Sequence, residues 1–401
     1  MRVSRATGTV RDMSDRIVRA PRDEHERATL ERVLQESFGN EGLPWTTWME
    51  RIGHENLRVV IADGAIRGGL GFYRFGQHWG GERVPMIGLA GVGVEPSWRG
   101  RGIARTFLVD TLAQARSEGV PLAGLYASSV AVYRAIGFEQ AGVTLRFEAP
   151  VASLARGDHA LACEPFDPLE NAHVRPLYDA RARRWDGHLV RTEAIWARIT
   201  QPYQGTARAY RFGPASAPEG YIVYSHQPGA DLHFGIALRD LVLATPAAAR
   251  RCAALLSDLR SLGRDLRWLG CASDPLVSLL PEESARIVEP HRWMLRILDP
   301  ARALAMRGYS SEGEASFVVR DALFGDHALH VRVRDGRAEV DTIAARRELP
   351  TLDTRALAAL YSGFANVSTL VAMGLVEGSI DGAHALARLF TRGEPWLCDW
   401  F

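Results

Sequence analysis

A glycine-rich loop between a predicted strand and a predicted helix is the segment best suited to chemistry. Residues 91–104 read GVGVEPSWRGRGIA, in which the strand stops at Pro96 and the helix begins near Ile103. The first N–H groups of a helix lack partners within the helix, and with the helix dipole they attract anions. Gly100 and Gly102 have no Cβ atoms to keep a phosphate from the backbone. We therefore predict an anion site whose rim carries the positive charges of Arg99, Arg101 and Arg105.

Three kinds of phosphate-binding loop compete for this segment, and an ordinary glycine-rich connection is the structural alternative. A P-loop requires a lysine, but all 48 basic residues of the chain are arginine, which excludes it. A dinucleotide-binding loop requires G-x-G-x-x-G directly after a strand, whereas here Arg105 occupies the third glycine position. Residues 99–104 match [QR]-x-x-G-x-[GA] completely, and so resemble the pyrophosphate loop of the GCN5-related N-acetyltransferase superfamily.

A second segment resembles the part of that superfamily that closes the site. Residues 125–142 read LYASSVAVYRAIGFEQAG, a strand end and a short helix with a tyrosine before a Gly-Phe turn. The resemblance implies that Tyr133 lies beside the thioester sulfur. A phenol, with a reference pKa of about 10, can protonate a departing thiolate. The alternative is that Tyr133 only packs before the turn. Tyr126 lies nearby at the strand end, where we expect it to form a wall of the site.

The elements that must position these residues follow a mixed α/β order. In the first block, apolar alternation predicts strands at 17–20, 57–61, 65–75 with a turn at Asp63-Gly64, 86–94 and 122–126, and helical spacing predicts helices at 22–38, 103–116 and 130–136. A second block repeats part of this order, with a strand at 236–244, a helix at 246–262 and a strand at 266–271, which indicates an internal duplication. A third block has predicted strands at 316–319, 328–334 and 337–343 and helices at 352–362 and 383–390.

The whole chain resembles the Eis, or enhanced intracellular survival, family of acetyltransferases. The resemblance implies an α/β (α+β) fold of two tandem GCN5-related acetyltransferase domains, the second degenerate, and a C-terminal domain similar to sterol carrier protein. We expect these domains at 1–149, 150–290 and 291–401. The resemblance also implies that only the first domain binds acetyl-CoA. In agreement, the second block has TPAAARR, with Pro246, where the first has WRGRGIA.

The resemblance implies site residues, carried over position by position. The C-terminal carboxylate, here that of Phe401, would accept the proton of the amine, and the apolar tail RLFTRGEPWLCDWF fits a buried chain end. Tyr133 would be the acid. The cofactor contacts would be Val92, Gly93, Val94, Arg99, Gly100, Arg101, Gly102, Ile103, Ala104, Arg105, Ser128 and Ser129. Candidates for the amine pocket are the carboxylates Glu36, Glu41, Glu50 and Asp399 and the aromatic side chains Phe38, Trp45 and Trp48.

Composition limits the remaining possibilities. The chain has 401 residues, 48 basic against 47 acidic, and a hydrophobic fraction of 47%, as in ordinary globular proteins. The near-neutral charge argues against general nucleic-acid binding, and no apolar run is long enough for a membrane span. The four cysteines form no C-x-x-C pair, so we expect no metal site and a cytoplasmic location. The family resemblance adds a homo-oligomer, a hexamer, as the expected assembly.

These observations predict an acetyl-CoA-dependent N-acetyltransferase that acts by direct transfer on aminoglycoside-like or polyamine-like amines. The carboxylates of the expected pocket would attract such cationic amines. Acetylation of lysine in a protein or peptide is the alternative within the same class. A non-catalytic protein that binds acyl-CoA or lipid is the alternative from another class.

Overall fold

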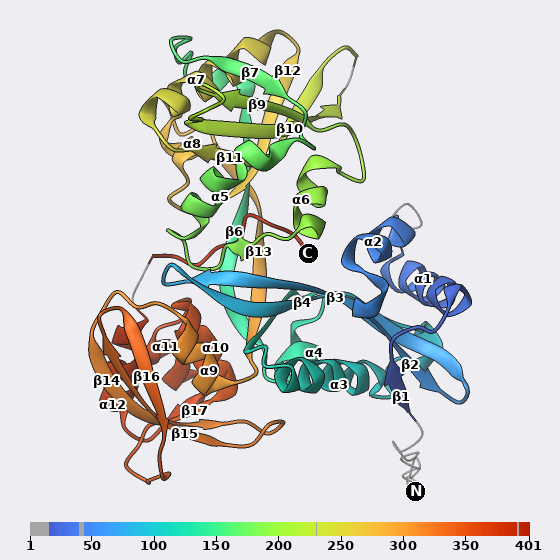
Figure 1. Ribbon diagram of the computed structural model, residues 1–401, viewed down its shortest axis with the longest axis vertical. Coiled ribbons are helices and arrows are strands. Elements are labelled where there is room, and N and C mark those ends of the chain that lie inside the picture. Colours follow the sequence, from blue (N-terminus) through green and yellow to red (C-terminus); the bar gives the residue numbers. More distant parts are fainter. Residues whose placement is uncertain (1–15, 40–43, 230, 391–392) are drawn as a thin grey trace, which may run out of the picture. The chain divides into compact units, whose positions relative to one another are not determined.

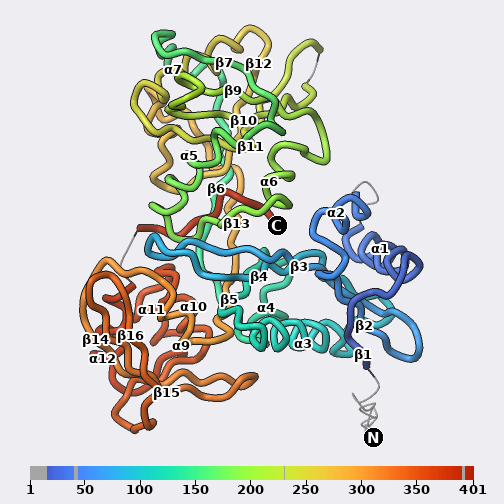
Figure 2. The backbone as a smooth tube through the Cα atoms, in the orientation of Figure 1, coloured from blue at the N-terminus to red at the C-terminus, as the bar shows by residue number. Residues whose placement is uncertain are grey.

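The computed structural model describes residues 16–39, 44–229, 231–390 and 393–401, so the candidate Glu41 lies outside the described residues. The chain divides into two compact units, Met1–Phe72 with Gly91–Leu112, and Tyr73–Ala90 with Ala113–Phe401. Figure 1 labels the elements of both units, and Figure 2 traces the chain by colour.

The first unit holds an antiparallel ladder and two helices. Strands β1 (Ile17–Arg19) and β2 (Leu57–Ala62) pair, and β2 pairs with the first part of β3 (Ala65–Trp79). The expected turn is confirmed at Asp63 and Gly64, whose φ angles of 49° and 71° suit a tight hairpin. Helix α1 (Glu24–Phe38) begins where the Asp23 side chain accepts a hydrogen bond from the Glu26 N–H at 2.9 Å. Helix α2 (Trp45–Ile52) is an element that the sequence analysis did not predict.

In the second unit, a mixed sheet carries most of the two acetyltransferase-like regions. Its strand order is β4-β5-β13-β6-β12-β11-β10-β9-β7. The bounds are β4 (Glu82–Val94, shared with the first unit), β5 (Leu122–Tyr126), β6 (Glu139–Pro150), β7 (Cys163–Phe166), β9 (Arg208–Phe212), β10 (Gly220–Pro228), β11 (Phe234–Leu243), β12 (Gly263–Gly270) and β13 (Arg286–Ile297). A short strand, β8 (Leu189–Val190), pairs with Gly76 and Gln77 of β3. The helices are α4 (Val130–Arg134), α5 (Arg175–Ala182), α6 (Glu193–Thr200), α7 (Pro246–Asp258) and α8 (Pro275–Ser278).

The element order supports the predicted duplication. Strands β4 and β5 are parallel and are separated along the chain by α3 (Ile103–Ser117), and β11 and β12 are parallel and are separated by α7. Parallel neighbours need such a crossover segment, which is why both regions read strand, loop, helix, strand. The Cys252 and Leu256 side chains of α7 are buried in one apolar cluster with Ile236 of β11 and Leu266 of β12.

The last region has its own sheet, with strand order β16-β15-β14-β17-β18. Figure 1 shows its helices beside these strands in orange and red. The bounds are α9 (Pro300–Met306), β14 (Gly313–Arg320), β15 (His327–Arg334), β16 (Arg337–Thr342), β17 (Thr351–Asp353), α10 (Thr354–Ser362), α11 (Val367–Ala372), β18 (Val376–Glu377) and α12 (Ile380–Leu389).

The domain boundary expected at 290/291 falls inside strand β13. This strand pairs with β6 from Arg286 onward and with β5 as far as Ile297, so it belongs to the large mixed sheet along its whole length. The new region begins after it, at α9. The boundary was predicted at Pro290 because proline often ends a strand. Here Pro290 lies within a long strand and does not end it.

Candidate active site

The predicted anion loop of the first unit opens α3 as expected. Gly100 and Gly102 have φ angles of 74° and 75°, a left-handed backbone that favours glycine. A Cβ on Gly100 would meet nothing within 4 Å, so this side of the loop is open. In the described part of the chain, the N–H groups from Gly102 to Arg105 have no hydrogen-bond partner, and the Thr106 N–H makes the first helical bond, to the Gly102 carbonyl at 3.1 Å. The loop therefore presents unpaired donors that suit an anion.

Arginines surround this loop, and one of them was not predicted. Arg99, Arg101 and Arg105 are exposed, as the sequence analysis expected of a charged rim. Arg16 donates a hydrogen bond to the Arg101 carbonyl at 2.8 Å and another to Thr106 Oγ1 at 3.0 Å, which ties the loop to the start of β1. No motif marks Arg16, because its role depends on a residue 85 positions away.

Just before the loop, the end of β4 carries the predicted backbone contacts. Val92, Gly93 and Val94 are its last three residues, and Gly93 is buried. The Val94 carbonyl accepts a hydrogen bond from Ser37 Oγ at 3.1 Å. A Cβ on Gly93 would lie 2.8 Å from Leu34 Cδ2, so glycine lets α1 approach the strand closely. Ile103 is buried and anchors the first turn of α3, with Ala104 beside it.

In the second unit, Tyr133 lies on the short helix α4 that follows β5. Its side chain is buried, its ring contacts Phe138 edge-on at 5.9 Å, and no described residue forms a hydrogen bond with its hydroxyl. Burial raises the pKa of Tyr133 to about 12, so the phenol keeps its proton at neutral pH. Ser128 and Ser129 precede the helix and are exposed, and the Ser129 side chain does not cap it.

An ion-paired carboxylate holds α4 in place. Glu139 is buried between Arg134, at 2.6 Å, and Arg355 of α10, also at 2.6 Å. Burial raises the pKa of Glu139, but the hydrogen bonds and charges of the two arginines outweigh it, and the net pKa is lowered. The helix of Tyr133 is thus fixed by a charge from the C-terminal region.

The parallel strands β4 and β5 separate after Gly88 and Gly124. Pairing of β4 with β5 runs from Met86 and Leu122 to Gly88 and Gly124, and no β5 partner follows for Leu89. Beyond that point Leu125 and Tyr126 pair only with β13. Separating strands leave backbone N–H and C=O groups without ladder partners, which is where an extended ligand can bind.

The last residue, Phe401, lies in an aromatic cluster of the second unit. Its ring contacts Phe75 at 5.0 Å, Tyr126 at 5.6 Å and Tyr73 at 6.3 Å, measured between centroids. A Cβ on Gly88 would lie 2.5 Å from Phe401 Cδ2, so a glycine is needed beneath this ring. Tyr126, the residue predicted to form a wall of the site, neighbours Phe401 in this cluster.

Hydrogen bonds hold the tail that leads to Phe401. The red end of the tube in Figure 2 runs beside β6, where Thr144 Oγ1 donates to the Leu397 carbonyl at 2.6 Å. The Trp396 N–H donates to the Asp186 carbonyl at 3.2 Å, and Tyr126 Oη donates to the Asp399 carbonyl at 3.0 Å. These contacts place the chain end firmly, and none of the partners carries a sequence signal.

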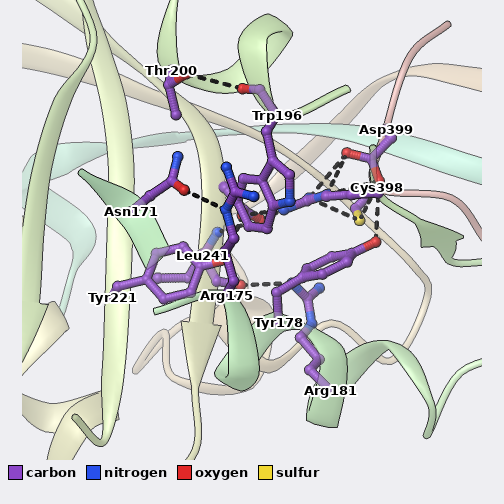
Figure 3. Close-up of polar contacts among 12 residues, drawn as sticks. Asn171, Arg175, Tyr178, Arg181, Trp196, Thr200, Tyr221, Leu241, Cys398 and Asp399 are labelled. Carbon is purple, nitrogen blue, oxygen red and sulfur yellow. Dashed lines mark hydrogen bonds and ion pairs between the residues drawn. The ribbon is translucent and has the colours of Figure 1, made fainter. Parts of the chain in front are cut away.

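The structure corrects the expectation that Asp399 binds the substrate amine. Its side chain is buried and forms an ion pair with Arg191 at 2.9 Å, and Arg191 also binds Asp240 at 2.5 Å. Tyr178 Oη donates to Asp399 Oδ2 at 3.2 Å, and Figure 3 shows Asp399 facing Tyr178 beside Cys398. A carboxylate that is buried and ion-paired in this way anchors the tail, and it is not free to bind a substrate ammonium group.

The other predicted pocket residues lie in the first unit. Phe38 is 45% exposed and contacts the buried Trp45 at 5.2 Å, and Trp45 contacts the buried Trp48 at 5.4 Å. Glu36 and Glu50 are exposed. The aromatic side chains thus form a cluster with Phe38 at its open side, and the two carboxylates face solvent.

The second acetyltransferase-like region lacks an open anion loop. Thr245 caps α7, because its Oγ1 accepts a hydrogen bond from the Ala248 N–H at 3.1 Å, and Pro246 contributes no N–H. The start of α7 therefore offers fewer free N–H groups to an anion than the start of α3 does.

Two other kinds of site have no candidate in the part of the chain that the structure describes. Across residues 16–39, 44–229, 231–390 and 393–401, no three His, Cys, Asp or Glu side chains gather as metal ligands do. Of the helices within those ranges, none has the length and apolarity that crossing a membrane requires.

Comparisons with known proteins match this arrangement. Two acetyltransferase (GNAT) domain families match residues 18–141 and 187–297, and the sterol carrier protein domain family matches residues 300–398. The GCN5-related N-acetyltransferase from Anabaena variabilis has a similar structure, with a TM-score of 0.91 and 29% identity over 96% of this chain and 100% of that one. Eis1 from Mycobacterium abscessus has a TM-score of 0.79 at 22% identity, over 96% of this chain and 100% of its own, which shows a shared fold.

Similar sequences carry the assignment further. An uncharacterized N-acetyltransferase of Streptomyces griseus is 30% identical over 349 residues, which are 80% of this chain and 83% of that one. The N-acetyltransferase Eis of Mycobacterium tuberculosis is 30% identical over 352 residues, which are 82% of this chain and 84% of that one. The predicted fold class, the resemblance and the enzyme class are thereby confirmed. The chain belongs to the Eis family of GCN5-related N-acetyltransferases.

Proposed function

We propose that this acetyltransferase transfers the acetyl group of acetyl-CoA directly to the amine of a small molecule. The observation that carries the proposal is the open loop at the start of α3, with left-handed Gly100 and Gly102 and unpaired N–H groups. These donors and the rim arginines suit a pyrophosphate. When bound, acetyl-CoA supplies an acetyl group activated as a thioester. The backbone groups of Val92, Gly93 and Val94, at the end of β4, would hold its pantetheine arm. Ser128 and Ser129 would lie near the reacting end.

The proposed acid is Tyr133. No described residue forms a hydrogen bond with its hydroxyl. Because its pKa is raised to about 12, the phenol keeps its proton until a strong base forms beside it. Such a base forms when the C–S bond of the thioester breaks, because a thiolate carries the released electron pair. Tyr133 would give its proton to that sulfur while the new N–C bond forms.

The proposed base is the carboxylate of Phe401. The amine loses one proton as it is acetylated, and the carboxylate would accept it or hold the ammonium group beforehand. The aromatic cluster and the tail hydrogen bonds support this role, since they fix the atom to which the carboxylate is attached.

The family resemblance suggests aminoglycoside-like or polyamine-like acceptors, a cytoplasmic location and a hexamer. Glu36 and Glu50 are exposed in the first unit and Asp399 is bound to Arg191, so these carboxylates do not by themselves select a cationic acceptor. The class of amine must therefore be measured on this protein.

The test is thiol release from acetyl-CoA by protein with its native C-terminus. A panel of aminoglycosides, linear polyamines, amino-acid-like amines and lysine peptides would be compared at saturating acetyl-CoA. Release with small amines supports the proposal, and release with peptides alone would replace it with protein acetylation. Acetyl-CoA binding without release on any amine would favour a non-catalytic binding protein.

A further inference from the structure

A cavity of about 330 Å³ in the second unit adjoins the chain end and is rich in arginine. Its lining includes Trp400, the residue before the proposed base, and the side chain of Arg198 on α6. Arg198 donates a hydrogen bond at 3.4 Å to Tyr73 Oη, and the Tyr73 ring contacts that of Phe401. The cavity therefore lies next to the residue that carries the proposed catalytic carboxylate.

Four arginines line this cavity, and they differ in whether their charge is balanced. Arg267 forms an ion pair with Glu148 at 2.7 Å, and Arg146 forms one with Glu289 at 3.3 Å. Within the described residues, neither Arg198 nor Arg239 has a carboxylate partner. Two arginines of the cavity thus hold positive charges that no carboxylate of the described residues pairs with.

The only carboxylate of the described lining is that of Asp399, and it does not supply the missing charge. Asp399 is bound to Arg191, a residue outside the lining, and Arg191 is shared with Asp240. This buried group contains two carboxylates and one guanidinium, and both carboxylates accept hydrogen bonds from it. Both carboxylates are therefore already engaged by Arg191, and among the described residues neither forms an ion pair with Arg198 or Arg239.

Arg239 is held in the cavity by local backbone geometry. In the pairing of β10 with β11, Val223 faces Asp240 and Tyr224 faces Leu238, so Arg239 is the extra residue of a β-bulge. Bulges redirect side chains and occur beside active sites. Of the residues that the structure describes, its guanidinium binds two neutral oxygens and no carboxylate: Ser225 Oγ at 3.1 Å and the Gln204 carbonyl at 3.3 Å. Burial and the charge of Arg198 both lower the pKa of Arg239, which means that the two guanidinium groups repel each other.

From this cavity we propose that the acetylated amine also carries an anionic group, a carboxylate or a phosphate, bound by Arg198 and Arg239. This rests on the proposed function for the reacting amine. Arginine forms strong charge-assisted hydrogen bonds to both kinds of anion, and a bound anion would relieve the repulsion between the pair. Trp400 and Ile195 supply apolar contact for the carbon skeleton between the two charged ends. A polycation would instead meet four guanidinium groups.

The first test compares matched amines in the thiol-release assay. One pair is 4-aminobutanoate and its neutral amide, and the other is phosphoethanolamine and ethanolamine. We expect kcat/KM to be about tenfold or more higher for the anionic member of at least one pair, mainly through a lower KM. Preference for a carboxylate or for a phosphate distinguishes the two anion classes. Equal or better use of the neutral amines, or of linear polyamines, would overturn the proposal.

The second test uses variants at the two unpaired arginines. Arg198→Gln and Arg239→Gln should lower kcat/KM for the anionic amine by roughly 10- to 100-fold and leave the neutral amine within about twofold. Arg198→Lys and Arg239→Lys, which keep the charge, should recover part of the loss. Arg250→Gln is the matched control, because Arg250 is an exposed arginine of α7 paired with Asp158. An equal loss on both amines would assign these arginines a structural role and reject the proposal.

A binding measurement separates this inference from the proposed function. Calorimetric titration of the N-acetylated anionic product into the protein needs no turnover. Binding that is lost in Arg198→Gln and kept in Arg250→Gln supports the anion pocket even if no amine releases thiol, in which case only the proposed function fails. Absence of binding to the native protein, together with turnover of neutral amines, rejects the anion pocket and leaves the proposed function standing.

Discussion

Gly88 on β4 lies directly against the ring of Phe401, and a Cβ at this position would lie 2.5 Å from Phe401 Cδ2. The same hypothetical atom would also collide with the Phe75 ring, on the other side of the cluster. The backbone of β4 is not left-handed here, so space alone requires the glycine. A strand residue 313 positions away thereby decides where the chain end is placed.

Gly88→Ala tests whether that placement matters. The added methyl group should displace the Phe401 ring and lower kcat by about 10- to 100-fold, because small misplacements of a catalytic group are costly. Overpacking should also destabilise the protein by about 1–3 kcal/mol. Gly393→Ala is the control, since a Cβ on Gly393 would meet nothing within 4 Å. Steady-state kinetics measure the effect. If the Gly88→Ala variant folds and its kcat is unchanged, the position of Phe401 is not used in catalysis.

Adding one residue after Phe401 tests the carboxylate itself. The extension moves the terminal charge by about 3.5 Å while the Leu397 anchor to Thr144 remains. We expect kcat to fall about 100-fold or more, with the dissociation constant of acetyl-CoA unchanged. The same residue added at the N-terminus is the control. Full turnover by the extended protein would remove the base role from the C-terminus.

Tyr133→Phe tests the proposed acid. Loss of the hydroxyl should lower kcat by about 100-fold and change acetyl-CoA affinity little. Because burial raises the pKa of Tyr133 to about 12, the native enzyme should show no loss of kcat from phenol ionisation up to about pH 10.5. A pH–rate profile checks this. An alkaline loss near pH 9 that disappears in Tyr133→Phe would contradict the raised pKa.

Gly100→Ala tests the anion loop against a closely matched control. Gly100 and Gly374 have φ angles of 74° and 68°, and a Cβ on either would meet nothing within 4 Å. Both alanine variants should therefore lose a similar amount of stability, about 1–2 kcal/mol, from the left-handed backbone. Only Gly100→Ala should weaken acetyl-CoA binding, by about tenfold, because its methyl group enters the loop. Equal acetyl-CoA affinity of the two variants, measured by calorimetry, would exclude the loop as the pyrophosphate site.

Asp240→Asn tests the ion pair that anchors the tail through Arg191. Burial raises the pKa of Asp240, but the charge and hydrogen bonds of Arg191 outweigh it, so the folded-state pKa lies below the unfolded one. This stabilisation is present above the unfolded pKa of about 3.9 and is lost as pH falls through the lower folded pKa. The melting temperature of native protein should therefore fall more steeply below about pH 5 than that of Asp240→Asn. Asp258→Asn, at an exposed pair with His159, should keep the native pH dependence.

The sequence by itself determined the features that depend on local chemistry. The Gly100–Gly102 loop, the start of α3, the Asp63-Gly64 turn and the capped α7 are set by residues within a few positions of one another. Strand β5 was predicted to the residue, because apolar alternation between turn signals marks a buried strand. The tandem strand–loop–helix order could likewise be predicted from the sequence.

Only the tertiary structure decided the features that join distant residues. Asp399 was predicted to bind substrate, but it is buried and bound to Arg191, 208 positions earlier. Strand β13 continued past the boundary expected at 290/291, because its partners β5 and β6 lie more than 100 residues before it. Arg198 and Arg239 come from a helix and a bulged strand, and a sequence pattern cannot show that neither has a carboxylate partner among the described residues. Local propensity acts over a few residues, whereas charge balance and packing depend on every element that folds into the same space.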